Sequence, residues 1–436
     1  MSKNDKTKND KTKNDKAWEK IFDKYNIIHS IEKQGFFEIT SEQINEFREA
    51  RLMTKFDNMS NLPEIFKNNE LAILPLTRGS YILSRFEAYK KLDNINDEII
   101  KVNFPKYIQS INYESINSEA TAINCAYVSG IIADFVEDDE LLPTVNGRMS
   151  SEEFSFNIKS KFDEKNIKID VKNSQIEIDG GYEGLKNLTL IEAKNFLSDD
   201  FLIRQLYYPF RLWQRSISKE VRTVFMVYTN GLFSLYEYKF MEPDNYNSLV
   251  LVKQKNYMIE EKDIELEDII NVYEKIKYVD EPEVPFPQAD RFERIINLCE
   301  LLNERNQLSK EEITYEYDFD PRQADYYANA GKYLNLIEKN TELDDTKFCL
   351  TEEGKSIFKL NFKQRQLKFV ELILRHQAFG DTMKLYVQEL EMPTRMQIVE
   401  IMKNSKLHKV ESASTFERRA STISGWINWI LDLINS

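Results

Sequence analysis

The sequence predicts a mixed α/β fold, of the α+β kind, with helical additions towards its C-terminal end. The first observation is a pair of runs with period-two alternation of apolar residues, Ile176–Asp179 and Leu188–Lys194, which is typical of strands. The second is a helical pattern over Phe201–Trp213, followed by strand-like runs on either side of Asn230-Gly231, a strong hairpin signal. The third is the acidic, proline-rich stretch Asp280–Pro287, after which amphipathic helical patterns predominate.

The composition is that of a globular protein with several domains. At 436 residues the chain is too long for one ordinary core, and we expect about two to four domains. No apolar run is long enough to span a membrane, and the opening lysines are not followed by the apolar segment of a secretory signal. We therefore expect a cytoplasmic protein that does not associate with a membrane.

The few cysteines and histidines narrow the possible chemistry. The three cysteines are isolated and lack metal-ligand spacing, and the three histidines are scattered. Zinc sites and histidine-based triads are therefore disfavoured, and carboxylates would have to carry any catalysis. The net charge of −14 describes solubility more than a local binding face, so it does not exclude a nucleic-acid partner. It does predict binding that depends steeply on salt and divalent cations.

The N-terminal region begins with a polar repeat and continues as a mixed module. Lys3–Lys16 repeats the motif KNDKT without an apolar residue, so we expect a disordered tail and ordered structure from near Trp18. A helix capped by Ser41 is predicted next. Two strands separated by Arg78-Gly79-Ser80 follow it.

Basic residues of this module stand among aromatic residues. Arginines near a glycine-containing turn can make bidentate contacts with phosphate or guanine, although each could equally be an ordinary surface residue. The candidates for nucleic-acid contact are Arg48, Arg51, Lys55, Arg78 and Arg85.

A helix is predicted over Ser118–Phe135, because small residues on its packing face suit close approach to a sheet. Glu119 lies in its first turn, where an acid is favoured by the helix dipole. Gly147 and Arg148 follow this helix, and alternating phenylalanines then predict another strand around Phe154.

The candidate catalytic residues lie on the pair of predicted strands within Gln175–Lys194. Glu192 and Lys194 share one face of the second strand, and Asp179 is expected to end the first strand at Gly180, where it can reach the same point. Carboxylates are hard oxygen donors that hold Mg²⁺, and a lysine beside the ion can stabilise or deprotonate an attacking water. The alternative is a solvated strand face that carries an ordinary Glu/Lys pair.

Two further acids compete with Asp179 as the first ligand. Glu177 shares its strand face, and Glu183 is a fallback. Asp179 is preferred because it directly precedes Gly180 and Gly181, where a bent strand would expose a metal ligand.

Asp179 followed thirteen residues later by Glu192-Ala193-Lys194 resembles the signature of PD-(D/E)XK nucleases. The order of strand, turn, strand with Glu-x-Lys, helix and strand is also that of the core in this family. The proline that often precedes the first acid is missing here. The resemblance implies Mg²⁺ bound by Asp179, Glu192 and the main-chain carbonyl of Ala193, with Lys194 helping to activate water. Members often add an acid from a preceding helix, which suggests a catalytic role for Glu119.

The helix after the motif presents polar positions near the expected site. Arg204 and Gln205 lie at its start and are candidates for DNA contact, together with Arg148. Pro209 is expected to kink this helix.

Beyond the proline-rich linker the pattern resembles a winged helix-turn-helix. Arg291–Arg305 is an amphipathic helix, Ser309 opens a capping box, and Asp320-Pro321 opens a third helix before two strands. Arg322 and Gln323 would lie on the helix that faces a DNA groove. The accompanying groove-facing residues would be Tyr326, Tyr327 and Asn329. Winged helices also mediate protein contacts, so that reading stays open.

A second helical unit runs from Lys363 to Ser436. It carries eleven basic and eight acidic side chains, although the whole chain is acidic. Its last helix is predicted to open with a capping box at Ser414, and Trp426 and Trp429 are assigned to the core. Hydroxyl and arginine side chains at its start suit contact with phosphates and base edges. These are Thr415, Arg418, Arg419 and Thr422.

We therefore expect a type II restriction endonuclease-like protein that hydrolyses double-stranded DNA with Mg²⁺. Cutting both strands would require a homodimer, and a cognate DNA methyltransferase is expected in the same system. The alternatives are a repair or junction-resolving nuclease and a non-catalytic winged-helix DNA-binding regulator. The predicted units are a tail (1–16), an N-terminal DNA-recognition module (17–113), a PD-(D/E)XK catalytic domain (114–280), a linker (281–287), a winged helix-turn-helix (288–360) and a second helical DNA-binding domain (361–436).

Overall fold

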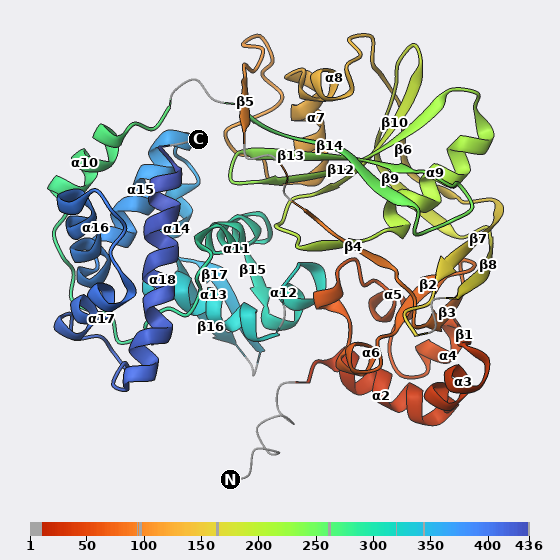
Figure 1. Ribbon diagram of the computed structural model, residues 1–436, viewed down its shortest axis with the longest axis horizontal. Coiled ribbons are helices and arrows are strands. Elements are labelled where there is room, and N and C mark those ends of the chain that lie inside the picture. Colours follow the sequence, from red (N-terminus) through yellow and green to blue (C-terminus); the bar gives the residue numbers. More distant parts are fainter. Residues whose placement is uncertain are drawn as a thin grey trace.

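The computed structural model describes residues 11–434, except for residues 94, 96, 97, 163, 164, 260–262, 320, 343 and 344. Its mixed α/β class agrees with the prediction from sequence. Three parts follow one another along the chain: an N-terminal module at the lower right of Figure 1, a central sheet with its helices at the upper right, and a helical C-terminal unit at the left. No helix among the described residues has the length and apolar character needed to cross a membrane.

The N-terminal module packs helices against a small sheet of order β1-β3-β2. Its elements are α2 (Lys13–Tyr25), α3 (Ile27–Gln34), β1 (Phe36–Thr40), α4 (Ser41–Asn45), α5 (Ala50–Met53), a 3-10 turn (Met59–Asn61), α6 (Glu64–Asn68), β2 (Ala72–Pro75) and β3 (Ser80–Ser84). The two strands predicted around Arg78-Gly79-Ser80 are therefore present. The cap of α4 is Thr40 rather than Ser41, because the Thr40 hydroxyl accepts from the Gln43 N–H.

Ordered structure begins earlier than the sequence predicted. Residues 1–10 lie outside the described residues, but α2 starts at Lys13, within the segment expected to be a tail. Thr12 and Asp15 form a capping box at its start. The Asp15 carboxylate also accepts from the Glu64 N–H at 2.7 Å, and the Asn14 amide donates to the Leu52 carbonyl at 3.0 Å. The polar side chains thus replace the missing apolar anchors.

The central sheet has seven strands in the order β5-β14-β13-β12-β10-β9-β6. Its strands are β5 (Ile99–Val102), β6 (Leu142–Ser150), β9 (Gln175–Glu183), β10 (Asn187–Lys194), β12 (Glu220–Thr229), β13 (Leu232–Phe240) and β14 (Leu249–Ile259). Strand β10, which lies next to the central strand β12, runs parallel to β12 and antiparallel to β9. The predicted hairpin is confirmed: Asn230 and Gly231 connect β12 and β13 with φ angles of 46° and 80°, as a type I′ turn requires.

Helices cover both faces of this sheet. α7 (Glu119–Val128) and α8 (Ile131–Val136) pack in one apolar cluster with Ile191 and Ala193, whereas Leu190 belongs to the cluster under α9 (Arg204–Ser216). The predicted helix Ser118–Phe135 is therefore split in two, because Gly130 adopts a φ of 80° between the halves. Ser118 caps the first half.

The helix predicted over Phe201–Trp213 starts later than expected. Its first residues form β11 (Asp200–Leu202), which pairs with β4 (Tyr89–Lys91) and thereby ties the sheet domain to the segment that follows the N-terminal module. Tyr208 and Arg211 of this helix are buried, although both side chains carry polar groups. A two-stranded ribbon of β7 (Glu153–Lys159) and β8 (Asn166–Lys172) extends below the sheet, and the predicted strand around Phe154 is thus present.

The first part of the C-terminal unit has the predicted order of three helices and two strands, with one additional strand. After α10 (Leu266–Lys275) come α11 (Phe292–Arg305), β15 (Gln307–Ser309), α12 (Lys310–Glu316), α13 (Pro321–Tyr333), β16 (Ile337–Glu342), β17 (Asp345–Leu350) and α14 (Glu352–Ile357). The sheet order is β15-β17-β16. The predicted capping box at Ser309 is present. Asp320 lies outside the described residues.

The last part of the chain is helical, as predicted, with α15 (Phe362–Leu374), α16 (Gln377–Glu389), α17 (Arg395–Asn404) and α18 (Ala413–Asp432). Trp426 and Trp429 are buried in one apolar core with α11, as expected. The cap of α18 is Ser412 rather than Ser414, since the Ser412 hydroxyl accepts from the Thr415 N–H. The linker is not a free spacer, because Phe286 is buried and stacks on Phe379.

Candidate active site

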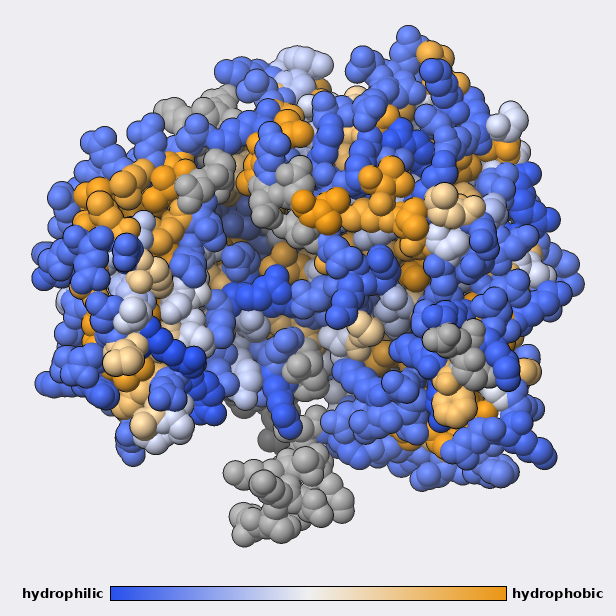
Figure 2. Space-filling model, viewed as in Figure 1, coloured by the Kyte–Doolittle hydropathy of each residue, from blue (hydrophilic) through white to orange (hydrophobic). Residues whose placement is uncertain are grey.

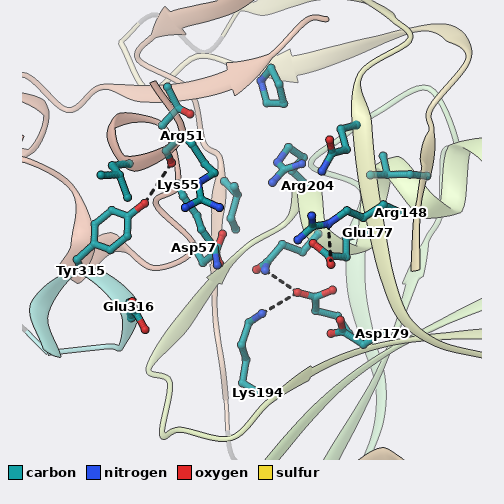
Figure 3. A pocket seen from close by; sticks show the side chains of 18 of the residues that line it. Arg51, Lys55, Asp57, Arg148, Glu177, Asp179, Lys194, Arg204, Tyr315 and Glu316 are labelled. Atoms are coloured by element: carbon teal, nitrogen blue, oxygen red, sulfur yellow. Dashed lines mark hydrogen bonds and ion pairs between the residues drawn. The ribbon is translucent and has the colours of Figure 1, made fainter. Parts of the chain in front are cut away.

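The three parts of the chain meet around a cleft of about 1110 Å³. Its lining includes residues of α4 and α5, the ends of β9 and β10, the start of α9, and α12. On the face of the molecule in Figure 2, hydrophilic side chains cover most of the N-terminal module, the part that supplies one wall of this cleft. In Figure 3 charged side chains of the N-terminal module, such as Lys55 and Asp57, face those of the sheet domain, such as Arg204 and Asp179. The cleft contains the motif strands and is therefore the candidate active site.

Asp179 reaches the motif because of the way β9 and β10 diverge. The described backbone pairs between these strands end at Ile191 and Gly180. One residue further, the Asp179 carboxylate accepts from the Ala193 N–H at 2.9 Å and so takes the place of a strand partner. From the sequence pattern, we predicted that β9 ends at Gly180. This was wrong, because β9 continues to Glu183, yet the predicted meeting of Asp179 with Glu192-Ala193-Lys194 occurs.

The two alternative acids are engaged elsewhere. Glu177 also lines the cleft, but its carboxylate pairs with Arg148 on β6 at 3.1 Å. Glu183 pairs with Lys219 at 2.6 Å and is not part of the cleft lining. The geometry therefore supports Asp179 as the first acid of the motif.

Glu192 and Lys194 lie at the base of the cleft. The Lys194 ammonium donates to Glu192 Oε1 at 2.7 Å, and the two residues are only 8% and 7% exposed. Gln205, predicted to contact DNA, instead donates from Nε2 to the same Glu192 oxygen at 2.6 Å. The Gln205 side-chain oxygen is buried without a protein partner. Gln205 thus holds the Glu192 carboxylate, a contact that no local sequence pattern indicates.

Burial and neighbouring charges shift the pKa values of this cluster. Burial, reinforced by Asp179, raises the pKa of Glu192 well above its usual value. Burial disfavours the charged form of Lys194, but the surrounding carboxylates, Glu192 first and then Glu119, outweigh it and raise its pKa well above the usual value. The surrounding carboxylates therefore favour the charged form of Lys194.

Two more acids face the same cluster. Glu119, at the start of α7, lines the cleft as predicted, and its pKa is raised by burial and by the negative charge of Asp179. Asp57, from the N-terminal module, also lines the cleft, and its charge raises the pKa of both Glu119 and Glu192. Sequence reasoning missed Asp57, because nothing in its local pattern relates it to a strand more than a hundred residues away.

The side chains fit a hard divalent cation by donor type and by charge. Four carboxylates, those of Asp57, Glu119, Asp179 and Glu192, act on the Lys194 ammonium, and Asp57 also lies 3.9 Å from the Lys55 ammonium. Carboxylate oxygens are the ligands that Mg²⁺ prefers. Within the described part of the chain, no group of three or more His, Cys, Asp or Glu residues is already arranged around one ion position. Asp179 and Glu192 currently accept hydrogen bonds from protein donors.

Basic side chains surround the acids. Six of the residues predicted to bind DNA line this cleft: Arg51, Lys55, Arg78, Arg148, Arg204 and Gln205. Arg148 and Arg204 come from the sheet domain, whereas Arg51 and Lys55 approach from the opposite wall (Figure 3). This gathering of cations from two parts of the chain was not visible in the sequence.

Other residues predicted to bind DNA do not line the cleft: Arg48, Arg85, Arg322, Gln323, Thr415, Arg418 and Arg419. Two residues of the predicted α18 face have internal roles. Arg419 donates to the Gln288 side chain at 2.7 Å, and Thr422, which is fully buried, donates to Asp290 at 2.8 Å. Tyr327, assigned to the groove-facing side of α13, is also buried. Arg418 is exposed.

Comparisons with known proteins match the chain to three family models, each described as a domain of unknown function. Residues 84–258 match a family model described as a domain of unknown function (DUF6997), residues 294–435 match another such domain (DUF7226), and residues 15–83 match a third (DUF6996). No curated protein matches the chain, and no solved structure does. The matches assign no activity, so a function can be proposed only from the cleft itself.

Proposed function

We propose that this protein is a Mg²⁺-dependent endonuclease of the PD-(D/E)XK type that cleaves double-stranded DNA, as type II restriction enzymes do. The observation that carries the proposal is the convergence of Asp179, Glu192 and Lys194 at the base of a cleft with cationic side chains on two walls. Buried acids with one lysine suit phosphodiester hydrolysis, and the surrounding cations suit a polyanionic substrate.

Each residue of the cluster has a distinct role in this chemistry. Asp179 and Glu192, with the main-chain carbonyl of Ala193, would hold Mg²⁺, and Glu119 would add a further acid. A bound Mg²⁺ would lower the pKa of a water and neutralise charge on the phosphate. Lys194, whose charged form is favoured by the neighbouring carboxylates, would orient the water and stabilise negative charge on the reacting phosphate.

Gln205 has a supporting role. It shares Glu192 Oε1 with Lys194, so two donors fix the orientation of this carboxylate. Its own buried oxygen has no protein donor, and a water at the site could donate to it.

The remaining parts of the chain would supply recognition and assembly. The order of helices and strands from α11 to β17 is that of a winged helix-turn-helix, which supports a reader role for Arg322 and Gln323 on α13. Cleavage of both strands at one position requires two catalytic clusters, so a homodimer is part of the proposal. A cognate DNA methyltransferase and a cytoplasmic location belong to the same proposal.

A structure-selective repair or junction nuclease is the second candidate, and one observation favours it. The N-terminal module and α12 touch beside the cleft: Tyr315 donates to the Arg51 carbonyl at 3.1 Å, and Arg48 pairs with Glu311 at 2.9 Å. Glu192 and Lys194 are also almost completely buried. Unpaired or branched DNA would reach such a confined site more easily than an intact duplex.

The deciding experiment is digestion of supercoiled plasmid and of branched oligonucleotides, with Mg²⁺ or with EDTA. Discrete plasmid fragments with Mg²⁺ alone support the restriction-type enzyme. Cutting confined to branched substrates supports the second candidate. Asp179→Asn should abolish either activity, because it keeps an acceptor for Ala193 but loses the charge. Glu183→Gln, an acid on the same strand that lies outside the cleft, is the matched control. Intact substrates after incubation with folded wild-type protein would refute the nuclease proposal.

A further inference from the structure

The segment that directly follows Lys194 is anchored in the C-terminal unit rather than in its own domain. Phe196 is 5% exposed and belongs to the apolar core formed mainly by α11 to α18. Its ring lies edge-on to that of Tyr317, with centroids 5.5 Å apart. The residue two positions after the catalytic lysine thus packs among side chains from a different part of the chain.

Asn297 of α11 forms hydrogen bonds with the backbone on both sides of Phe196. Its side-chain oxygen accepts from the Leu197 N–H at 3.1 Å, and its side-chain nitrogen donates to the Asn195 carbonyl at 3.3 Å. Asn297 is fully buried. A buried amide that satisfies one donor and one acceptor of an extended segment acts as a short strand partner, and its removal leaves both backbone groups unpaired.

The C-terminal unit also holds the segment three residues further along. Asp199 pairs with Arg291 at 2.9 Å and with Arg294 at 2.8 Å, and its N–H donates to the Asp318 carboxylate at 2.7 Å. Arg294 is buried, and Asp318 also accepts from Ser60 of the N-terminal module. All three parts of the chain therefore meet on the loop behind the catalytic lysine.

The position of Lys194 depends on this loop because the end of β10 pairs with a neighbouring strand on its β12 side only. On the β12 side the pairing extends to Lys194, opposite Val227, but on the β9 side the described pairs stop at Ile191. Beyond Ile191 that side is held by the Asp179 carboxylate, which bonds to Ala193. A free loop after Lys194 would leave the end of β10 attached mainly along one edge.

We propose that Asn297 is a positioning residue for Lys194, and that through it the C-terminal unit sets the ammonium against Glu192. This role rests on the proposed nuclease function, since it concerns the same cluster. It makes the C-terminal unit part of the catalytic machinery, in addition to any role in reading DNA. A change in α11 on DNA binding would reach Lys194 through only three residues of backbone.

The experiment compares Asn297→Ala with Cys299→Ala in the full chain. Cys299 is equally buried on the same helix, and the hydrogen bonds and ion pairs described above for the loop do not involve it, so it controls for loss of stability in α11. We expect hydrogen exchange of residues 195–200 to rise in Asn297→Ala and not in Cys299→Ala. We expect kcat to fall roughly tenfold to a hundredfold, because small displacements of a catalytic group cost about this much. DNA affinity, measured with Ca²⁺, should stay within about twofold.

A second variant keeps the test informative if Asn297→Ala does not fold. Phe196→Leu retains an apolar anchor of smaller size and should give the same pattern with a smaller loss of kcat. A loop that exchanges faster while kcat is unchanged would overturn the positioning role. So would equal losses of kcat in Asn297→Ala and Cys299→Ala. Absence of Mg²⁺-dependent cleavage by the wild-type protein would instead overturn the proposed function, and this result requires neither variant.

Discussion

The central sheet carries two buried ion pairs, and they differ in what surrounds them. Glu192 and Lys194 on β10 meet at 2.7 Å, with side chains 10% and 9% exposed. Arg222 on β12 and Glu237 on β13 meet through two hydrogen bonds of 2.6 and 2.7 Å, and are similarly buried. In the second pair, Arg222 also donates to the Val136 carbonyl, and Lys253 lies 3.7 Å from Glu237. The charges of Arg222 and Glu237 are thus balanced by groups of the protein itself.

The difference shows that burial of an ion pair does not by itself mark a functional site. At Arg222 and Glu237 the bidentate geometry satisfies both groups, and the pair stabilises the fold. At Lys194 four carboxylates act on one buried ammonium beside a cleft that a cation from solution can enter. The excess of acids over the buried lysine, and not the ion pair, distinguishes the candidate active site.

The largest effect is expected from removal of the lysine in the acidic cluster of the cleft. Lys194→Ala should lower the rate of cleavage by roughly a thousandfold or more, because it removes the charge that stabilises the reacting phosphate. Specific DNA binding in Ca²⁺ should change little. Lys253→Ala, which alters the matched pair, should leave cleavage intact. Retained cutting by Lys194→Ala would remove this residue from the site and end the distinction between the two pairs.

Replacement of Glu237 should lower stability and leave activity unchanged, whereas replacement of Glu192 should abolish activity without loss of stability. Glu237→Gln leaves a buried guanidinium without its carboxylate and should lower the free energy of unfolding by about 3–5 kcal/mol, with activity per folded molecule unchanged. Glu192→Gln removes one of several repelling acids, so stability should be unchanged or higher while cleavage is lost. Denaturant unfolding and plasmid digestion of both variants check this. A marked loss of stability in Glu192→Gln would show that its cluster is structural too.

His376 provides a third case of a buried ionisable group, after the two ion pairs. Burial, together with Arg375, lowers the pKa of His376 to about 3, and neither ring nitrogen has a partner within the described structure. Because the folded-state pKa is depressed, the neutral ring stabilises the fold above the unfolded pKa of about 6.5, and this stability is lost as the pH falls towards 3.

Between pH 7 and pH 5, the free energy of unfolding should therefore fall by about 2 kcal/mol through this residue. His376→Phe should abolish that part of the pH dependence, as measured by urea unfolding at the two pH values. An identical pH dependence in the wild type and in His376→Phe would show that His376 is already protonated or exposed.

The smallest effects are expected from single arginines on two surfaces. Arg51→Ala, at the cleft, should lower DNA affinity roughly fivefold and reduce the salt slope by about one, because one phosphate contact is lost. Arg418→Ala, on the exposed start of α18 and outside the cleft lining, should lower it by about twofold or less. Titrations at several salt concentrations compare the two. A larger loss in Arg418→Ala would transfer the main DNA contact to α18.

Local patterns were sufficient for most elements of the fold. The alternation in β9 and β10, the Asn230-Gly231 turn and the capping box at Ser309 each depend on neighbours a few residues away, and each was predicted correctly. Errors arose where a distant contact overrode a local pattern. The polar segment before Trp18 folds because Asp15 binds the Glu64 N–H, a partner that no local window contains.

The sequence by itself determined the motif: its spacing brings two acids and a lysine to adjacent strands, because strand alternation and a short connection fix their faces. Only the tertiary structure decided which other residues join them. Asp57, Gln205 and Asn297 come from three different parts of the chain, and they meet at the motif because helices and loops pack together after the strands have paired. Pairing along one strand is short in range, whereas convergence of distant segments depends on packing that a sequence pattern does not record.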